Sequence, residues 1–188
     1  MLLLALRRLE RIDSRVVLKN PYWEYRLDHY TYSGGQAGEY HFLHTPGAAM
    51  IVPVDDSGEV VVVKQFRYLC QRESIEFPAG GVKDNDYLLT ARNELAEEAQ
   101  FAAENWDEVG EFNPYNGVAD EICKVYLATK LSHAVAERDP SEEFEILKLS
   151  LSRFDELIEA RVIWDGMTLA AWSLAKKHVS KYLKKTVG

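Results

Sequence analysis

Hydrophobic and polar positions along the chain predict several short strands in its main part. The strand-like runs are rich in β-branched and aromatic residues and are bounded by Gly, Pro, Asp or Asn. One run opens with four consecutive valines, so we expect this strand to be buried on both faces. The Asp-Asp-Ser-Gly sequence at 55–58 just before it predicts a hairpin turn. The predicted strands cover residues 48–53, 60–66, 109–112, 124–128 and 145–149.

Helical periodicity appears in three stretches. In residues 87–101 the apolar side chains recur at the spacing of one helix face. Residues 151–160 and 168–183 are amphipathic at the same period, and we expect Thr168, which follows Gly166, to cap the last helix. Strands, a helix, more strands and then helices indicate an α+β domain. We expect a mixed β-sheet between helices, in an α/β/α arrangement, rather than a doubly wound parallel sheet.

The N-terminal part of the chain has a different pattern. Residues 15–45 are rich in aromatic side chains, and the glycine-rich turn signal at 33–38 lies between two strand-like runs. This predicts a small antiparallel β unit over residues 1–44, ahead of the main domain at 45–188. Such a unit is too small to be stable alone.

Charge and cysteine content narrow the function classes. The formal net charge is −8, which argues against a nucleic-acid partner because such proteins usually present a basic face. The two cysteines form no CxxC pair, and we expect reduced thiols in a cytoplasmic protein. The apolar run at residues 2–6 is too short to span a membrane and lacks the features of a signal peptide, so we expect no membrane partner.

Three glutamates form the most informative cluster. Glu94, Glu97 and Glu98 have i, i+3, i+4 spacing, so they project from one side of the predicted helix, at the edge of its apolar stripe. Like charges at this spacing destabilise a helix unless something offsets the repulsion. Carboxylates together with a backbone carbonyl suit a hard divalent cation, and we expect the Pro-Ala-Gly-Gly turn at 78–81 to leave a carbonyl free. Without a metal, the same spacing would be a solvated acidic face.

Four blocks of sequence, in order, resemble the Nudix hydrolase superfamily. The Glu-Leu-Ala-Glu-Glu run at 94–98 is similar to the core of the Nudix box, and Glu-Phe-Pro-Ala-Gly at 76–80 is similar to the entry found in its ADP-ribose and nucleoside-diphosphate-sugar branch. Residues 62–68 resemble that branch's strand ending in Q-x-R, and residues 112–121 resemble its F-x-P-x-x-G-x-x-D/S-E stretch. Four blocks together are far more specific than one motif.

The chain departs from the Nudix box at several positions. Gly80 and Glu94 are one residue closer than in the pattern, and Asp84 or Asp86 stands in for the usual loop glutamate. Asn93 replaces the usual arginine, and Gln100 replaces the terminal glycine. The three helix glutamates are unchanged.

The resemblance implies a metal site and its ligands. Carried over from the family, Mg²⁺, with Mn²⁺ as a substitute, would be held by Glu94, Glu98 and the carbonyl of Ala79. Glu97 would be a further ligand or a base that orients water. Bound metals would also supply the positive charge that an acidic protein needs to act on phosphates.

The resemblance also implies residues that act on the substrate. Relatives bring a glutamate from a loop after the box helix, as general base or additional ligand, and here that residue is Glu142 or Glu143. An acidic loop of this kind can equally be a solvated one. Arg67 is a candidate clamp for the pyrophosphate or a ribose. Glu76 and Glu121 are candidates for binding sugar hydroxyls.

The activity implied is hydrolysis of a nucleoside diphosphate sugar, such as ADP-ribose or GDP-mannose, to a nucleoside monophosphate and a sugar phosphate. The N-terminal unit would pair with a second subunit in a homodimer. Two alternatives stay open: hydrolysis of a dinucleoside polyphosphate or coenzyme A, and a Nudix-fold sensor that binds nucleotides without cleaving them.

Overall fold

The computed structural model describes residues 8–32, 35–137 and 143–186. The chain divides into two compact units. The N-terminal unit comprises the chain up to Pro46 together with Tyr115–Glu121, and the main unit comprises Gly47–Pro114 and the chain from Ile122 onward. The sequence placed a boundary after residue 44 and could not show that a later segment joins the first unit.

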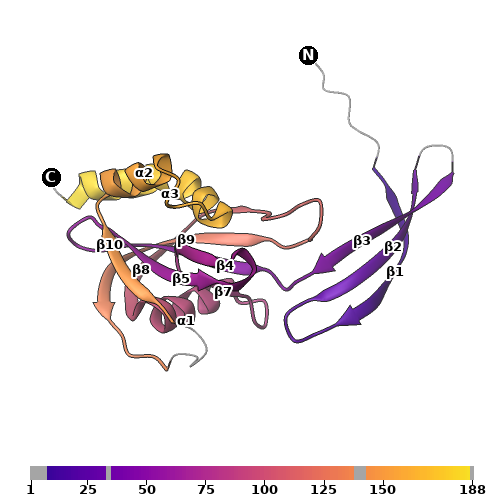
Figure 1. Ribbon diagram of the computed structural model, residues 1–188, viewed down its shortest axis with the longest axis horizontal. Coiled ribbons are helices and arrows are strands. Elements are labelled where there is room, and N and C mark those ends of the chain that lie inside the picture. Colours follow the sequence, from indigo (N-terminus) through magenta and orange to yellow (C-terminus); the bar gives the residue numbers. More distant parts are fainter. Residues whose placement is uncertain (1–7, 33–34, 138–142, 187–188) are drawn as a thin grey trace, which may run out of the picture. The chain divides into compact units, whose positions relative to one another are not determined.

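The N-terminal unit is a three-stranded antiparallel sheet. Its strands are β1 (Glu10–Lys19), β2 (Glu24–Tyr32) and β3 (Gln36–His44), in the order β1-β2-β3 (Figure 1). All ten residues of β1 are exposed, whereas Leu27 on the central strand is buried. The predicted antiparallel β unit is confirmed, with one more strand than the two runs suggested.

Backbone hydrogen bonds attach residues 115–121 to the end of β3. The Leu43 amide donates to the Val118 carbonyl at 2.8 Å, and the Asp120 amide donates to the Leu43 carbonyl at 3.2 Å. The Asp120 carboxylate also lies 2.7 Å from Nδ1 of His44. Part of the F-x-P-x-x-G-x-x-D/S-E stretch therefore belongs structurally to the N-terminal unit.

The main unit contains a mixed sheet, as predicted. Its central strands have the order β10-β5-β4-β9-β8, with β6 paired to β5 and β7 paired to β4. β4 and β9 are parallel and the other pairs are antiparallel. The strands are β4 (Ala48–Val54), β5 (Val60–Arg67), β6 (Arg72–Glu76), β7 (Ala79–Gly81), β8 (Phe101–Phe112), β9 (Cys123–His133) and β10 (Glu145–Leu149). A single 3₁₀ turn, η1 (Tyr68–Cys70), joins β5 to β6.

Helices cover both faces of this sheet (Figure 1). α1 (Tyr87–Ala99) packs on one face through Ala91, Leu95 and Ala99, opposite Val61 and Val63. α2 (Leu151–Glu159) and α3 (Gly166–Thr186) pack on the other face, on a second apolar core. The alternating valines of β5 contribute to both cores, as their continuous run predicted.

Several element boundaries differ from the sequence prediction, and β9 in particular extends to His133 rather than ending at 128. β8 starts at Phe101 rather than 109, because its polar residues form a sheet edge without a simple alternation. α1 ends at Ala99, and Gln100 adopts the left-handed conformation (φ 59°) that ends a helix. α3 is capped by the Asp165 carboxylate, which accepts from the Thr168 amide at 2.7 Å, so the predicted cap at Thr168 was wrong.

In the described part of the chain, no helix combines the length and apolar character needed to cross a membrane.

Candidate active site

α1 brings two of its three glutamates to the edge of the sheet. The Asp86 side chain caps the helix by accepting from the Leu89 amide at 2.9 Å. Because the apolar side of α1 faces the sheet, Glu98 at the edge of that side is only 7 % exposed. Glu97 is exposed, so the structure separates the two neighbouring carboxylates.

The Pro-Ala-Gly-Gly segment meets Glu98 directly. The Ala79 amide donates to Oε2 of Glu98 at 3.0 Å. The sequence suggested that this segment is a turn outside any strand pairing. In the structure Ala79–Gly81 instead forms β7, which pairs with β4. The Ile51 amide donates to the Pro78 carbonyl on the β4 side. Since the amide and carbonyl of one strand residue point to the same side, the Ala79 carbonyl points away from β4, as its amide does.

Gly80 provides the space that Glu94 occupies. A Cβ atom added at Gly80 would overlap the carboxylate of Glu94. At the next position, Gly81, an added Cβ would meet nothing within 4 Å. The absence of a side chain at Gly80 therefore allows Glu94 to lie against the backbone of β7, one residue from the Ala79–Glu98 contact.

These donors fit a hard divalent cation. The carboxylates of Glu94 and Glu98 on α1 and the carbonyl of Ala79 on β7 are all oxygen ligands. Mg²⁺ is usually held by one or two carboxylates, and waters complete its coordination shell. No group of three or more His, Cys, Asp or Glu side chains suited to a metal occurs within the described ranges. Glu94 and Glu98 lie beside Ala79–Gly80, and the role of the exposed Glu97 as a further ligand or as a base that orients water stays a prediction.

Arg67 and Glu76 form a two-pronged ion pair beside this site. Nε of Arg67 donates to Oε1 of Glu76 at 2.8 Å, and a second guanidinium nitrogen donates to Oε2. Hydrogen bonding to Glu76 raises the pKa of Arg67, and the charges of Glu76, Asp165 and Glu98 raise this pKa further. Glu76 is buried, whereas the Arg67 side chain is about half exposed. The guanidinium is therefore fixed in place with part of its surface open to an anion.

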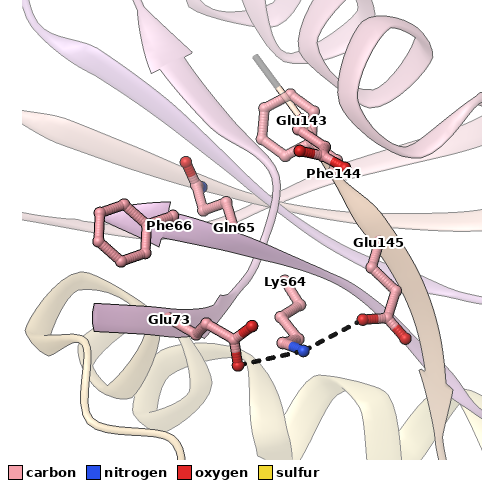
Figure 2. Close-up of a pocket in the computed structure, with 7 residues that line it drawn as sticks. All are labelled: Lys64, Gln65, Phe66, Glu73, Glu143, Phe144 and Glu145. Atoms are coloured by element: carbon pink, nitrogen blue, oxygen red, sulfur yellow. Dashed lines mark hydrogen bonds and ion pairs between the residues drawn. The ribbon is translucent and has the colours of Figure 1, made fainter. Parts of the chain in front are cut away.

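The loop candidates lie before β10. Glu142 lies outside the described residues. Glu143 is exposed and lines a cavity of about 250 Å³ at the end of β5. The other residues that line this cavity are Lys64, Gln65, Phe66, Glu73, Phe144 and Glu145 (Figure 2).

Glu121 belongs to the N-terminal unit. Its carboxylate accepts a hydrogen bond from the Thr45 hydroxyl at 3.3 Å. Burial raises the pKa of Glu121 above its ordinary value. A carboxyl group held in this way can accept or donate hydrogen bonds to hydroxyls, and its role in substrate binding stays a prediction.

Sequence reasoning missed two residues near Arg67. Trp164 donates from Nε1 to the Glu73 carbonyl at 3.1 Å, and its ring lies 3.6 Å from the guanidinium carbon of Arg72. Asp165, the cap of α3, adds negative charge near Arg67. An acidic residue just before a helix was the available signal for Asp165; no local signal pointed to Trp164.

A family model described as the NUDIX domain matches residues 44–170. An ADP-ribose pyrophosphatase of Bacillus subtilis (strain 168) is 34 % identical over 140 residues, which are 73 % of this chain and 76 % of the relative. A methanol dehydrogenase activator of Bacillus methanolicus is 29 % identical over 149 residues, covering 78 % and 80 % of the two chains. A crystal structure of an ADP compounds hydrolase has the same fold, with a TM-score of 0.81, 16 % identity and coverage of 95 % and 97 %.

Proposed function

Because the chain belongs to the Nudix hydrolase family, we propose that it cleaves the pyrophosphate bond of ADP-ribose or a related nucleoside diphosphate sugar, such as GDP-mannose. The main support is one arrangement of residues. Glu94 and Glu98 converge on Ala79–Gly80, close to the Arg67–Glu76 pair. Negatively charged ligands for a cation thus lie beside a fixed guanidinium, as hydrolysis of a diphosphate requires.

The reaction adds water to one phosphorus and breaks its bond to the bridging oxygen. The products are a nucleoside monophosphate and a sugar phosphate. Glu94, Glu98 and the Ala79 carbonyl would hold Mg²⁺, or Mn²⁺ in its place. When bound, the cation neutralises phosphate charge and lowers the pKa of a water ligand. Arg67 orients the phosphates or a ribose, and Glu97, Glu142 or Glu143 accepts the proton of the attacking water.

The ion pair with Arg67 changes the role proposed for Glu76. Both oxygens of its carboxylate already accept from Arg67. Glu76 therefore acts first by holding the guanidinium in one orientation, and contacts with sugar hydroxyls are secondary. Arg is suited to this arrangement because its planar fork can bind one carboxylate and still present other N–H groups.

The first experiment is turnover of ADP-ribose and GDP-mannose, with Mg²⁺ and with excess chelator. We expect Mg²⁺-dependent release of nucleoside monophosphate. Glu98→Gln keeps an acceptor for the Ala79 amide but removes the charge, so we expect about a hundredfold or greater loss of kcat with little change in thermal midpoint. Glu111→Gln, on β8, is the matched control.

The possible results of these measurements distinguish the proposed function from its alternatives. Full activity of Glu98→Gln would contradict the metal assignment. Cleavage only of dinucleoside polyphosphates or coenzyme A would change the substrate class but keep the chemistry. Tight binding of sugar nucleotides with Mg²⁺, without product, would make the protein a sensor.

The assembly and location are part of the same proposal. The exposed first strand of the N-terminal unit supports a homodimer. Within the described residues neither Cys70 nor Cys123 takes part in a disulfide, which supports a reducing compartment such as the cytoplasm.

A further inference from the structure

Lys64 lies on β5 between two carboxylates from the neighbouring strands. Its Nζ is 3.1 Å from Oε2 of Glu73 on β6 and 3.3 Å from Oε2 of Glu145 on β10 (Figure 2). In the sheet register, Lys64 is directly opposite Glu145. One ammonium group therefore ties three adjacent strands together.

The ion pairs of Lys64 matter most for β10, because β10 is the edge strand on its side of the sheet. β10 pairs with β5 through only five residues, and Glu145 is the first of them. Short strands at a sheet edge open most readily at their ends. The Lys64–Glu145 pair fastens β10 at the end next to Glu143, which lies two residues earlier in the chain.

The Lys64 ammonium and the Glu143 side chain lie on different sides of β5. Lys64 points toward Glu73 and Glu145, whereas Glu143 and Gln65 lie across the strand from it (Figure 2). Lys64 therefore acts on Glu143 through the backbone of β10, by holding that strand at Glu145, and not through its own charge.

The same cavity reaches the substrate-binding end of β5. Gln65 and Phe66 line it, and Arg67, which pairs with Glu76, follows them on the strand. We propose that Lys64 is a positioning residue, which holds Glu143 next to the Gln65–Arg67 segment so that its carboxylate can accept a proton during hydrolysis. This inference rests on the proposed function, and it selects Glu143 over Glu142.

The test compares Lys64→Met with Lys64→Arg and with Lys148→Met. Lys148 is also on the β5–β10 pair, at the other end of β10, and pairs with Asp55 at 2.9 Å. The carboxylate partners of Lys64 are exposed, and exposed ion pairs contribute little to folding stability. Asp55 is only 12 % exposed, so a thermal melt of each variant checks that it folds. Steady-state kinetics with ADP-ribose and Mg²⁺, and hydrogen exchange of residues 143–149, are measured for each.

We expect Lys64→Met to lower kcat by about tenfold to a hundredfold with KM changed less than about threefold, because a misplaced catalytic group slows the chemical step. Lys64→Arg should restore most of the rate, and Lys148→Met should behave as wild type. Amides at 143–147 should exchange faster in Lys64→Met than in Lys148→Met. An unchanged kcat in Lys64→Met, or an equal loss in Lys148→Met, would overturn the proposal.

The exchange measurement separates this inference from the proposed function. If the wild-type protein cleaves none of the substrates, the proposed function fails, and the catalytic role of Lys64 fails with it. The fastening of β10 is then judged on exchange alone. Equal exchange at 143–147 in Lys64→Met and Lys148→Met would overturn that part as well.

Discussion

At the residue scale, a missing side chain shapes the site as much as the carboxylates do. Glu94 can lie against the backbone of β7 because Gly80 carries no Cβ. Glu98 is held by a hydrogen bond from the amide of Ala79, the residue before Gly80. Both contacts involve β7, a strand of three residues. The position of the metal ligands therefore depends on a short piece of backbone rather than on other side chains.

Gly80→Ala should lower activity without unfolding the protein. Gly80 does not have a positive φ, so alanine carries no backbone strain there. The new methyl group would push aside the flexible end of Glu94, and we expect kcat to fall by about tenfold or more, since small misplacements of a ligand are costly. Steady-state kinetics over a Mg²⁺ titration and a thermal melt measure the two effects.

Gly81→Ala is the matched control, because an added Cβ there has open space. Its activity should equal that of the wild-type protein. If both alanine variants keep full activity, Glu94 does not need its position against Gly80. If both lose activity together, the cause is the strand and not the carboxylate.

At the element scale, a row of ionisable side chains crosses the N-terminal sheet. Nδ1 of His29 on β2 is 2.8 Å from the Asp13 carboxylate on β1, and Nε2 is 3.4 Å from Glu39 on β3. Glu39 also lies 3.6 Å from His41. Both ring nitrogens of His29 face carboxylates, an arrangement that suits the protonated ring, since only that form donates from both.

This row should make the N-terminal sheet more stable at acidic pH. The hydrogen bond to Asp13, together with the charges of Asp13 and Glu39, raises the pKa of His29 above 6.5. A raised pKa in the folded state contributes stability that is fully present below the unfolded pKa and is lost as the pH rises through the folded value. An NMR titration should give a pKa for His29 above 6.5.

Thermal melts of the wild type and His29→Asn at two pH values test the effect on stability. The wild type should lose more stability than the variant as the pH rises from below the ordinary histidine pKa to above the raised pKa of His29, because the ring then loses its proton. His178→Asn, which alters a histidine on α3, should follow the wild type. A pH dependence shared by all three proteins would contradict a role for His29.

At the scale of the whole molecule, β1 is a long strand whose residues are not covered by the rest of the described chain. Its ten residues are all exposed, and apolar side chains are among them, including Val16 and Leu18. Natural proteins usually protect such edges by pairing or covering them. A second copy of the chain would provide that cover.

We expect light scattering to give twice the mass of one chain. A Val16→Lys, Leu18→Lys double variant should shift the protein toward the monomer, because it places charges on the exposed strand. Val135→Lys alters an apolar residue of the main unit that is even more exposed than Val16 and Leu18, and it should leave the mass unchanged. A wild-type protein that is monomeric, or a double variant that stays dimeric, would contradict this assembly.

Local spacing in the sequence determined much of the fold and the chemistry. The four valines predicted a strand buried on both faces, and the spacing of Glu94 and Glu98 placed them on one side of a helix, as the structure confirms. Helix and strand periods are set by backbone geometry, so residues close in sequence reveal them. The family motif then identified a hydrolase.

Only the tertiary structure decided which of these residues meet. The burial of Glu98 and the exposure of Glu97, the pairing of Arg67 with Glu76, and the bridge from Lys64 to Glu145 all depend on strands that are distant in sequence. The attachment of residues 115–121 to β3 is of the same kind. Such contacts are set by sheet register and by the packing of helices on its faces, and no spacing along the chain encodes either of these locally.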